Sequence, residues 1–463
     1  MEKKSVTNTA KFIVELWNTG IFAAVWLLYY NAYTFDTYQQ LGGTITIPLY
    51  FVFYNTLCNV YKAFRFASSS IGETVFSQFI SFGIADLIFY VLCCLIHNQY
   101  VNIWLGVVAV LVQLAGTGLI AIQTKKYFMK AVPPRKTVLI YGGDTTKEEA
   151  LAFSKRILNK YEHLFLITYV GSENEELESL ELQMEACDNV LLFEVESKMR
   201  VALLDYCVRK QKSVYFTPSL DDILLQGCTP KHLLDTPLMK YDYTYQKGYY
   251  SKRLWDVVIS LLILVITSPI LLLTALAIKL EDGGPVFFKQ ERCTKDAKIF
   301  SILKFRSMIV DAEKNGVTPC TSNDSRITKV GKIIRATRID ELPQLINVLK
   351  GDMSFVGPRP ERIEHVEQYC KELPEFAYRM RVKGGLTGYA QIFGKYNTSA
   401  YDKLRLDMMY IENQSLLLDL KIMMLTFRTI FTPEATEGFT AEKSEAMQEK
   451  TGALEIQKSE VQV

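Results

Sequence analysis

Hydrophobic residues gather in four long stretches within the first 130 positions of the chain. They cover residues 12–30, 44–61, 75–96 and 101–123, and each is close to the roughly 20 residues that a helix needs to cross a bilayer. A secretory signal would be a single short apolar region with a small-residue cleavage site, which four stretches do not match. The pattern therefore predicts a four-helix transmembrane domain over residues 1–130.

Basic residues between these stretches predict how the helices are oriented. Lys and Arg occur before the first stretch, between the second and third, and after the fourth. Residues 31–43 and 97–100, which we expect to form the two other loops, contain neither. Cytoplasmic loops of membrane proteins are enriched in Lys and Arg, so both ends of the domain are predicted to face the cytoplasm.

Asp86 falls in the middle of the third stretch. An ionisable residue within a membrane helix is a functional candidate by default. The alternative is an aspartate that faces the bundle and bonds to Gln113 or Asn55 of a neighbouring helix. No second carboxylate or histidine suggests a proton relay, which favours the structural interpretation.

Between residues 136 and 245 short apolar runs rich in β-formers alternate with helical stretches. The expected strands lie at 137–141, 164–170, 190–193 and 213–216, and the expected helices at 147–160 and 198–210. Such alternation is typical of a parallel sheet covered by helices. We therefore predict a soluble, Rossmann-like α/β module.

The turn after the first strand of this module reads Gly142-Gly143-Asp144. A dinucleotide-binding fingerprint would have its glycines here, but the second and third glycines of G-x-G-x-x-G are absent. Two interpretations follow: a module that binds a nucleotide, or one that keeps the nucleotide-binding fold for packing or regulation. The missing glycines favour the second.

A fifth apolar stretch, residues 257–278, contains Ser268-Pro269 at its middle. Proline removes a backbone donor and kinks or ends a helix, and each half is then too short to span a bilayer. Ser268 can bond to carbonyls that the break frees. The stretch is either a kinked span or a re-entrant helix, and we favour the re-entrant helix because the basic motifs that follow suit a phosphorylated, cytosolic substrate.

Charge is unevenly distributed along the chain. The net charge of +2, from 52 basic and 50 acidic residues, argues against a nucleic-acid-binding protein. Residues 286–362 carry 15 Lys and Arg against 9 Asp and Glu, whereas residues 432–463, predicted to be a disordered acidic tail, carry 7 Glu against 3 Lys. The basic region could bind anionic lipid headgroups or hold phosphates in a site. The nine cysteines form no CxxC pair and indicate neither a zinc site nor a disulfide framework.

Three clusters make a phosphate site the better explanation. Lys304 and Arg306 alternate around an aromatic residue, so a strand would place them on one face. Arg335 precedes the adjacent acids Asp340 and Glu341 at a predicted helix start, and residues 351–360 form a glycine- and proline-rich turn. Adjacent carboxylates point in different directions, so one can approach a phosphorus while the other holds a hard cation. An acidic pair at a helix start is also favourable for electrostatic reasons alone.

Residues 252–431 carry several long motifs in a fixed order. They read KRLWDVVIS; GPVFFKQER; FSILKFRSM; RATRIDELPQLINVLKGDMSFVGPRP; GLTGYAQIFG; and YDKLRLDMMYIENQSLLLDLKI. Together they resemble the bacterial sugar transferases, the polyprenyl-phosphate hexose-1-phosphate transferases of capsule and exopolysaccharide synthesis. The four helices and the α/β module resemble the large membrane-bound form of this family by architecture alone.

The predicted fold class is therefore that of an α/β membrane protein. It has a four-helix transmembrane bundle, a Rossmann-like α/β module over residues 136–245, and a mainly α catalytic domain over residues 248–431. A re-entrant helix, residues 253–280, would anchor the catalytic domain.

The resemblance implies roles for ten residues. Asp340 matches the nucleophilic aspartate of the family, and Glu341 matches its partner in catalysis and Mg²⁺ binding, so both are the implied metal ligands. The other matches are basic residues near the phosphates (Lys304, Arg306 and Arg335), the turn at the nucleotide (Pro358, Arg359 and Pro360) and the break of the membrane helix (Ser268 and Pro269).

The resemblance also implies a reaction and a location. A multi-pass enzyme of the bacterial inner membrane, with its catalytic domain in the cytoplasm, would transfer a hexose-1-phosphate from a UDP-sugar to polyprenyl (undecaprenyl) phosphate and release UMP. This is the initiating step of capsular or exopolysaccharide synthesis, and glucose and galactose are the sugars that the family suggests. Transfer would pass through a phospho-aspartyl intermediate, or directly with Asp340 as a Mg²⁺ ligand or base. The implied partners are these substrates, the lipid bilayer, a second copy in a homodimer and other polysaccharide-assembly enzymes.

Two other classes of function are weighed against this one. A non-catalytic membrane assembly or regulatory protein of polysaccharide synthesis would use the helices and the α/β module for docking, but the intact pair Asp340-Glu341 argues against it. An NAD(P)-linked oxidoreductase would work from residues 136–240, where the missing glycines argue against it.

Overall fold

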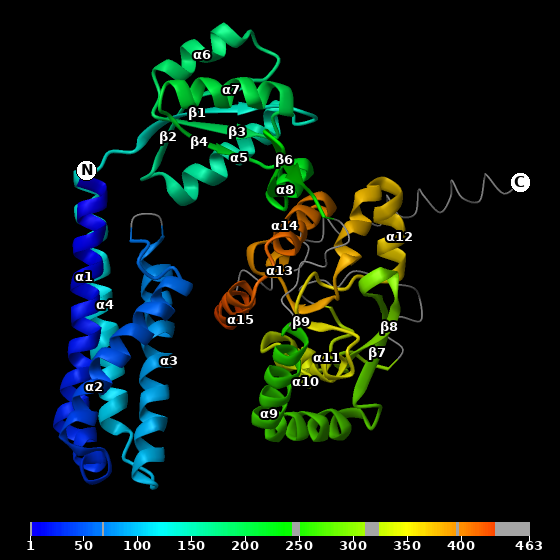
Figure 1. The fold of residues 1–463 in the computed structure, drawn as a ribbon. Helices are drawn as coiled ribbons and strands as arrows, with labels where there is room; N and C mark the ends of the chain where they lie inside the picture. Colours follow the sequence, from blue (N-terminus) through cyan, green and yellow to red (C-terminus); the bar gives the residue numbers. More distant parts are fainter. Residues whose placement is uncertain (1, 67–68, 243–250, 311–323, 395–397, 431–463) are drawn as a thin grey trace, which may run out of the picture. The chain divides into compact units, whose positions relative to one another are not determined.

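The computed structural model describes residues 2–66, 69–242, 251–310, 324–394 and 398–430 (Figure 1). The chain divides into two compact units, residues 1–219 and 220–463, and each is described by itself. The predicted acidic tail, residues 432–463, lies outside the described residues.

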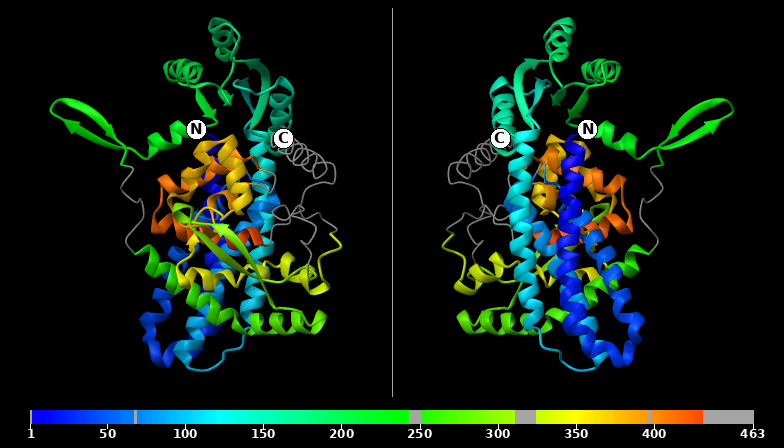
Figure 2. Two further views of the ribbon diagram at one scale, coloured as in Figure 1. Left: turned by 90° about the vertical axis from the view of Figure 1, so that its right-hand side faces the viewer. Right: turned by 90° about the vertical axis from the view of Figure 1, so that its left-hand side faces the viewer.

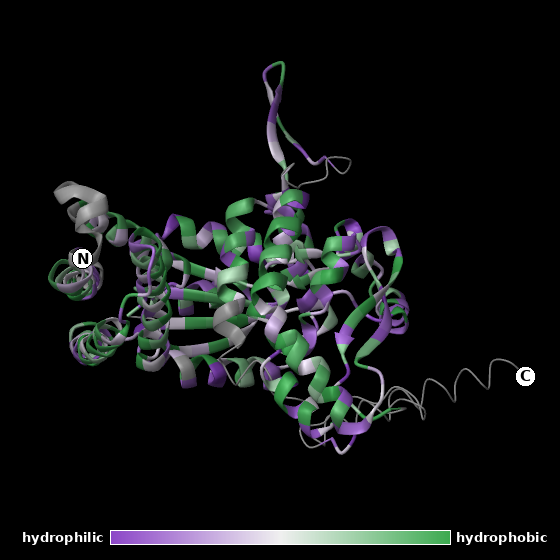
Figure 3. Ribbon diagram, turned by 90° about the horizontal axis from the view of Figure 1, so that it is seen from below, coloured by the Kyte–Doolittle hydropathy of each residue, from purple (hydrophilic) through white to green (hydrophobic). Residues whose placement is uncertain are grey.

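The first unit begins with the four predicted apolar helices. They are α1 (Glu2–Val25), α2 (Asn31–Val60), α3 (Ile71–His97) and α4 (Trp104–Ala131), with a π-helical turn, Trp26–Tyr30, between α1 and α2. The segment Val6–Tyr30, α3 and α4 are long and apolar enough to cross a membrane, and the apolar part of α2, Ile45–Val60, is shorter. Figure 3, which looks along these helices from below, shows hydrophobic residues on their described turns, and many of their large apolar side chains are exposed.

The loop predicted for residues 31–43 is wrong. Helix α2 begins at Asn31 and continues through this segment. A hydropathy pattern marks where apolar residues end, but a helix can continue through polar residues when no proline interrupts it. The first proline after Asn31 is Pro48, inside α2.

Asp86 lies within the bundle of the first unit, as predicted. Its Oδ1 accepts a hydrogen bond from the hydroxyl of Tyr50 at 2.8 Å, and the side chain of Gln113 donates to the same hydroxyl at 3.3 Å. The side chain of Asn55 donates to the carbonyl of Phe51 in its own helix instead. Tyr50, which the sequence did not suggest, therefore links Asp86 to Gln113.

The predicted parallel α/β module completes the first unit. Its elements are β1 (Arg135–Tyr141), α5 (Lys147–Tyr161), β2 (Phe165–Ser172), α6 (Leu177–Glu185), β3 (Asn189–Phe193), α7 (Ser197–Arg209) and β4 (Ser213–Phe216). The sheet is parallel with the order β2-β1-β3-β4. Only α6 was not predicted. The central strands β1 and β3 are the most buried because helices pack over the sheet.

The second unit is mainly helical, as predicted, with three two-stranded sheets among its described residues. Its helices are α8 (Leu220–Gln226), α9 (Lys252–Asp282), α10 (Lys329–Ala336), α11 (Gln344–Lys350), α12 (Ile363–Glu372), α13 (Tyr389–Phe393), α14 (Ala400–Glu412) and α15 (Leu416–Ile430). Its strands are β5 (Thr229–Leu233), β6 (Thr236–Lys240), β7 (Phe287–Cys293), β8 (Ile299–Phe305), β9 (Ser354–Val356) and β10 (Gly385–Thr387). Figure 2 shows the hairpin of β5 and β6, whose residues are all exposed.

Three hydrophobic cores hold the described part of this unit together: the two that follow, and a third that joins α9, β8 and α10 through Ile278, Phe305 and Ile334. The larger core joins α8, α11, β9, α14 and α15 through residues that include Leu345, Phe376 and Met408. A smaller core packs β8 against α11 and the turn after it, through Phe300, Ile302, Val348 and Met353.

Helix α9 is bent. Figure 1 shows two limbs that meet at an angle, and Pro269 lies inside the helix. Because proline has no N–H group, the carbonyl of Val265, four residues earlier, loses its helical donor. The Ser268 hydroxyl donates to that carbonyl at 2.8 Å, so the predicted role of Ser268 at the break is confirmed. The helix is long and apolar enough to cross a membrane.

Candidate active site

The acidic pair lies in a tight turn between two helices. Asp340 and Glu341 belong to a 3₁₀ turn, Ile339–Glu341, and α11 begins three residues after Glu341, behind Pro343. Arg338, directly before the turn, has a φ of 58°, a left-handed conformation that costs a non-glycine residue about 1 kcal/mol. The predicted helix start is therefore a separate turn, entered through the left-handed Arg338.

Glu341 is held by two cations from different elements. The Lys304 Nζ, at the end of β8, donates to its Oε1 at 2.9 Å, and the Arg359 Nη2 donates to the same oxygen at 2.6 Å. The Glu341 side chain is 14% exposed. Burial raises its pKa, but Arg359 and Lys304 outweigh burial and hold the pKa well below the usual range. Glu341 is therefore an ionised carboxylate with a fixed orientation.

Asp340 differs from Glu341 in its hydrogen bonding and in the direction of its pKa shift. Its Oδ1 is buried and has no hydrogen-bond partner among the described residues. Burial and the neighbouring Glu341 carboxylate raise the pKa of Asp340, and the cations Lys304, Arg335 and Arg338 oppose this rise only in part. The environments of the two carboxyl groups thus push their pKa values apart, a pattern typical of groups with different roles in one site.

The predicted phosphate-binding residues separate into two places. Lys304 contacts Glu341, and Arg335 lies close enough to lower the pKa of Asp340. Arg306 follows the last residue of β8 and forms an ion pair with Asp282 at the end of α9. Its Nε and Nη1 are buried without a hydrogen-bond partner in the part of the chain that the structure describes. Its predicted contact with phosphate stays a prediction.

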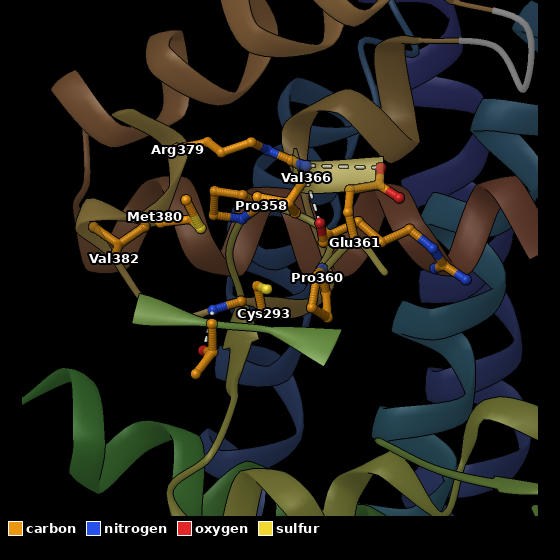
Figure 4. A pocket seen from close by; sticks show the side chains of 11 residues that line it. Cys293, Pro358, Pro360, Glu361, Val366, Arg379, Met380 and Val382 are labelled. Atoms are coloured by element: carbon orange, nitrogen blue, oxygen red, sulfur yellow. Dashed lines mark hydrogen bonds and ion pairs between the residues drawn. The ribbon is translucent and has the colours of Figure 1, made fainter. Parts of the chain in front are cut away.

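The turn Pro358-Arg359-Pro360 lines a small pocket (Figure 4). The hollow is partly open to solvent and has about 20 Å³ of free space, far less than the roughly 300–1,000 Å³ of most small-molecule sites. Because the Arg359 side chain also reaches Glu341, this turn connects the pocket to the acidic pair.

The sequence did not predict a group of buried charged residues in and around the pocket wall. Arg379 is 5% exposed, and its Nη2 lies 2.7 Å from the Oδ2 of Asp407 on α14. The same nitrogen donates to the carbonyl of Arg359 at 2.9 Å, and Arg292 donates to that of Pro360 at 3.2 Å. Figure 4 shows Arg379 reaching across the pocket toward Glu361. Nothing in the sequence marks these contacts, because their partners are between 20 and 68 residues apart.

The acidic pair fits a magnesium ion that is shared with a substrate. Mg²⁺ is usually held by one or two carboxylates together with substrate phosphates. The Oδ1 of Asp340, which has no hydrogen-bond partner among the described residues, and the ionised Glu341 are the oxygen donors that would hold such an ion. The described residues hold no group of three or more His, Cys, Asp or Glu that could bind a metal without such a substrate.

The glycine turn of the α/β module holds a carboxylate of the protein itself. The Glu173 Oε1 accepts a hydrogen bond from Gly143 N–H at 2.6 Å, and its Oε2 accepts one from Glu196 N–H, at the start of α7, at 2.7 Å. A side chain at Gly142 would collide with this carboxylate. In dinucleotide-binding folds the N–H groups of this turn bind phosphate. The arrangement favours the interpretation of a module used for packing or regulation.

Comparison with known proteins places this site in a family. The family model described as bacterial sugar transferase matches residues 247–433. A UDP-glucose:undecaprenyl-phosphate glucose-1-phosphate transferase from Caulobacter vibrioides is 44% identical over 188 residues, which are 40% of this chain and 70% of the relative. This chain belongs to the bacterial sugar transferase family.

Two other relatives are longer than the shared region. The UDP-N-acetylgalactosamine-undecaprenyl-phosphate N-acetylgalactosaminephosphotransferase of Aeromonas hydrophila is 46% identical over 184 residues. A UDP-glucose:undecaprenyl-phosphate glucose-1-phosphate transferase of Klebsiella pneumoniae is 45% identical over 207 residues. The chain spans 44% and 43% of the lengths of these two relatives. The similarity thus lies in the sugar transferase region, which contains every residue of the candidate active site.

Proposed function

We propose that this protein transfers a hexose-1-phosphate from a UDP-sugar to polyprenyl phosphate, with release of UMP, to initiate a capsular polysaccharide or an exopolysaccharide. The observation that carries the proposal is the acidic pair, in which Glu341 is bound by two cations while a buried oxygen of Asp340 has no partner among the described residues. The names of the related transferases support the two substrates.

Asp340 is the nucleophile in this reaction. A carboxylate oxygen of Asp340 attacks the β-phosphorus of the UDP-sugar, the bond from that phosphorus to the bridging oxygen breaks, and UMP leaves with the bridging oxygen. An oxygen of polyprenyl phosphate then attacks the phosphorus of the acyl phosphate and releases the Asp340 carboxylate. A bound Mg²⁺ would supply charge neutralisation on the diphosphate. Lys304, Arg335 and Arg359 lie where cations can stabilise the charge that builds up on the phosphoryl oxygens.

The contacts of α9 support its insertion from one face of the membrane. At its start, the Arg253 guanidinium donates to the carbonyls of Val348 and Leu349 in α11. At its end, Glu281 accepts from the N–H groups of Lys329 and Val330 in α10. A straight helix of 31 residues would be about 46 Å long and would put its ends on opposite sides of a bilayer. Here both ends bind the same folded unit, which a bent, re-entrant helix permits.

In this arrangement the site lies at the membrane surface. The UDP-sugar reaches it from the cytoplasm, and the phosphate of the lipid acceptor reaches it from the headgroup layer. We place the catalytic domain on the cytoplasmic face of the bacterial inner membrane, because nucleotide sugars are cytosolic substrates. A homodimer and contacts with other polysaccharide-assembly enzymes belong to the same proposal.

One assay tests the function directly. The full-length protein in nanodiscs is given undecaprenyl phosphate, Mg²⁺ and, separately, UDP-glucose, UDP-galactose and UDP-N-acetylgalactosamine, and UMP is measured. We expect UMP release and a lipid-linked sugar phosphate with at least one donor, and neither product with the Asp340→Asn variant. Equal UMP release by this variant, or no lipid product with any donor from folded wild-type protein, would overturn the proposal.

A further inference from the structure

Charged side chains, in addition to apolar ones, attach the first two turns of α9 to the rest of the second unit. Asp256 is 6% exposed. Its Oδ2 accepts a hydrogen bond from the Ser354 hydroxyl at 2.9 Å, and its Oδ1 accepts one from the N–H of Phe355 at 3.1 Å. An aspartate in the first two turns of a long apolar helix thus binds the backbone and side chain of strand β9 instead of facing lipid or water.

Strand β9 leads directly into the turn that carries Arg359. Its last residue, Val356, is fixed by the Tyr410 hydroxyl, which donates to its carbonyl at 3.0 Å. The N–H of Gly385 donates to the carbonyl of Pro358 at 2.8 Å, and Arg379 donates to the carbonyl of Arg359. The backbone between Ser354 and Arg359 is therefore held at several points, and Asp256 holds its first two residues.

The opposite side of the acidic pair is held by the same turn of α9. Arg253 donates to the carbonyls of Val348 and Leu349, at 2.5 and 2.7 Å. These carbonyls end α11, the helix that begins just after Glu341. A cation is favourable at the C-terminus of a helix. One helical turn thus holds both the segment that carries Glu341 and the segment that carries its partner Arg359.

We propose that Asp256 is a positioning residue of the transferase: through Ser354 and Phe355 it fixes strand β9, and so places Arg359 on Glu341. Asp256 touches neither the acidic pair nor a substrate-facing atom, so its effect on the reaction passes through Arg359. The seating of the membrane helix in the folded unit is thereby coupled to the geometry of the active site. This inference rests on the proposed transferase function.

The test is a double-mutant cycle on the full-length protein in nanodiscs. Asp256→Asn keeps the shape of the side chain but weakens both hydrogen bonds, and we expect kcat for UMP release to fall about 10- to 100-fold, as for a small misplacement of a catalytic group, with a smaller change in KM for the UDP-sugar. In an Arg359→Lys background the same change should cost less than about 2-fold, because residues that act through one another are not additive. Full additivity of the two losses would overturn the proposal.

Two controls separate positioning from folding. Asp205→Asn makes the same chemical change in an exposed ion pair with Arg209 and should leave kcat unchanged, since such pairs contribute little. If Asp256→Asn does not fold, Ser354→Ala removes the hydroxyl that donates to Asp256 Oδ2 and to the Val356 carbonyl, without a charge change, and should lower kcat about 3- to 10-fold because the same strand loses its anchor. Wild-type activity from Ser354→Ala and additivity in the cycle both contradict the proposal.

Hydrogen exchange gives a reading that does not depend on turnover. Asp256→Asn should speed amide exchange at residues 354–360 and leave exchange in α14 unchanged, because only the first segment loses its anchor. Unchanged exchange at residues 354–360 would overturn the positioning role even if kcat fell. If the wild-type protein releases no UMP, the proposed function fails, while the exchange measurement still decides whether Asp256 fixes this segment.

Discussion

The adjacent carboxylates of Asp340 and Glu341 differ in their hydrogen-bond partners and in the direction of their pKa shifts. Glu341 is paired with Lys304 and Arg359, and its pKa lies well below the usual range. Asp340 is buried beside a like charge, which raises its pKa. The difference arises because Lys304 and Arg359 both bind Glu341, whereas the Oδ1 of Asp340 has no hydrogen-bond partner in the part of the chain that the structure describes. Substitutions at the two positions should therefore affect stability in opposite directions.

Asp340→Asn should abolish turnover, by at least about 10³-fold, and should raise the melting temperature. The sign follows from the raised pKa: folding favours the protonated form of Asp340, so at neutral pH its charge destabilises the folded state, and removal of the charge relieves that cost. Glu341→Gln should also lose activity but melt at a lower temperature, because Lys304 and Arg359 lose their anionic partner. UMP release and thermal unfolding in detergent measure both effects. A lower melting temperature for Asp340→Asn would contradict the burial argument.

The raised pKa of Asp340 also predicts how the rate depends on pH. Only the ionised carboxylate can attack phosphorus, so kcat/KM for the UDP-sugar, which reports groups of the free enzyme, should fall about tenfold per pH unit below this pKa. The fall should begin at a higher pH than the value of about 3.9 that is usual for aspartate, while the folded fraction stays constant. The measurement is kcat/KM for the UDP-sugar against pH. A rate that stays flat down to pH 4 would show that Asp340 is ionised throughout and does not limit the chemistry.

At the scale of helices and strands, the sequence was informative wherever one residue type determines the local structure. The apolar runs in the α/β module predicted all four strands, because buried parallel strands are continuous in hydrophobicity. Ser268 and Pro269 predicted the bend, and the Ser268 hydroxyl donates to the Val265 carbonyl that the proline leaves without its helical donor. Contacts between distant segments could not be predicted. Arg306 binds Asp282 and Arg379 binds Asp407 only because the fold brings separate elements together.

The bent helix α9 predicts a specific membrane topology. Single cysteines at Ser251 and at Lys289, in a chain without other reactive thiols, should both be labelled only from the cytoplasmic face, because both ends of α9 bind the same unit. A cysteine at Gln99, in the loop after α3 that is predicted to face the periplasm, should be labelled only from the opposite side. Lys289 is preferred to Gly284, because a side chain at Gly284 would collide with Arg306. Labelling of Lys289 from the periplasm would exclude a re-entrant helix.

At the scale of the whole molecule, the chain divides at a point that the composition does not mark. The division falls between residues 219 and 220, so that α8 belongs to the second unit. Leu220 and Ile223 of α8 are buried in the core that also contains Leu404 and Met408 of α14. Residues 243–250, which lie between this helix and α9, are outside the described part of the chain.

This division predicts how much of the chain transferase activity needs. A shortened chain that begins at Thr217 keeps α8, α9 and every residue of the candidate site, and should make lipid-linked product in nanodiscs. A chain that begins at Tyr249 lacks Leu220 and Ile223, whose burial contributes about 1.5–3 kcal/mol each. It should therefore unfold at a lower temperature, although its site residues are all present. Two measurements on each chain test this difference: activity per folded molecule and thermal unfolding. Asp340→Asn in each chain is the inactive control. The chain that begins at Thr217 could be folded and bound to the membrane and yet make no product, while the full-length protein does. In that case the first unit must contribute to the site or to an active oligomer.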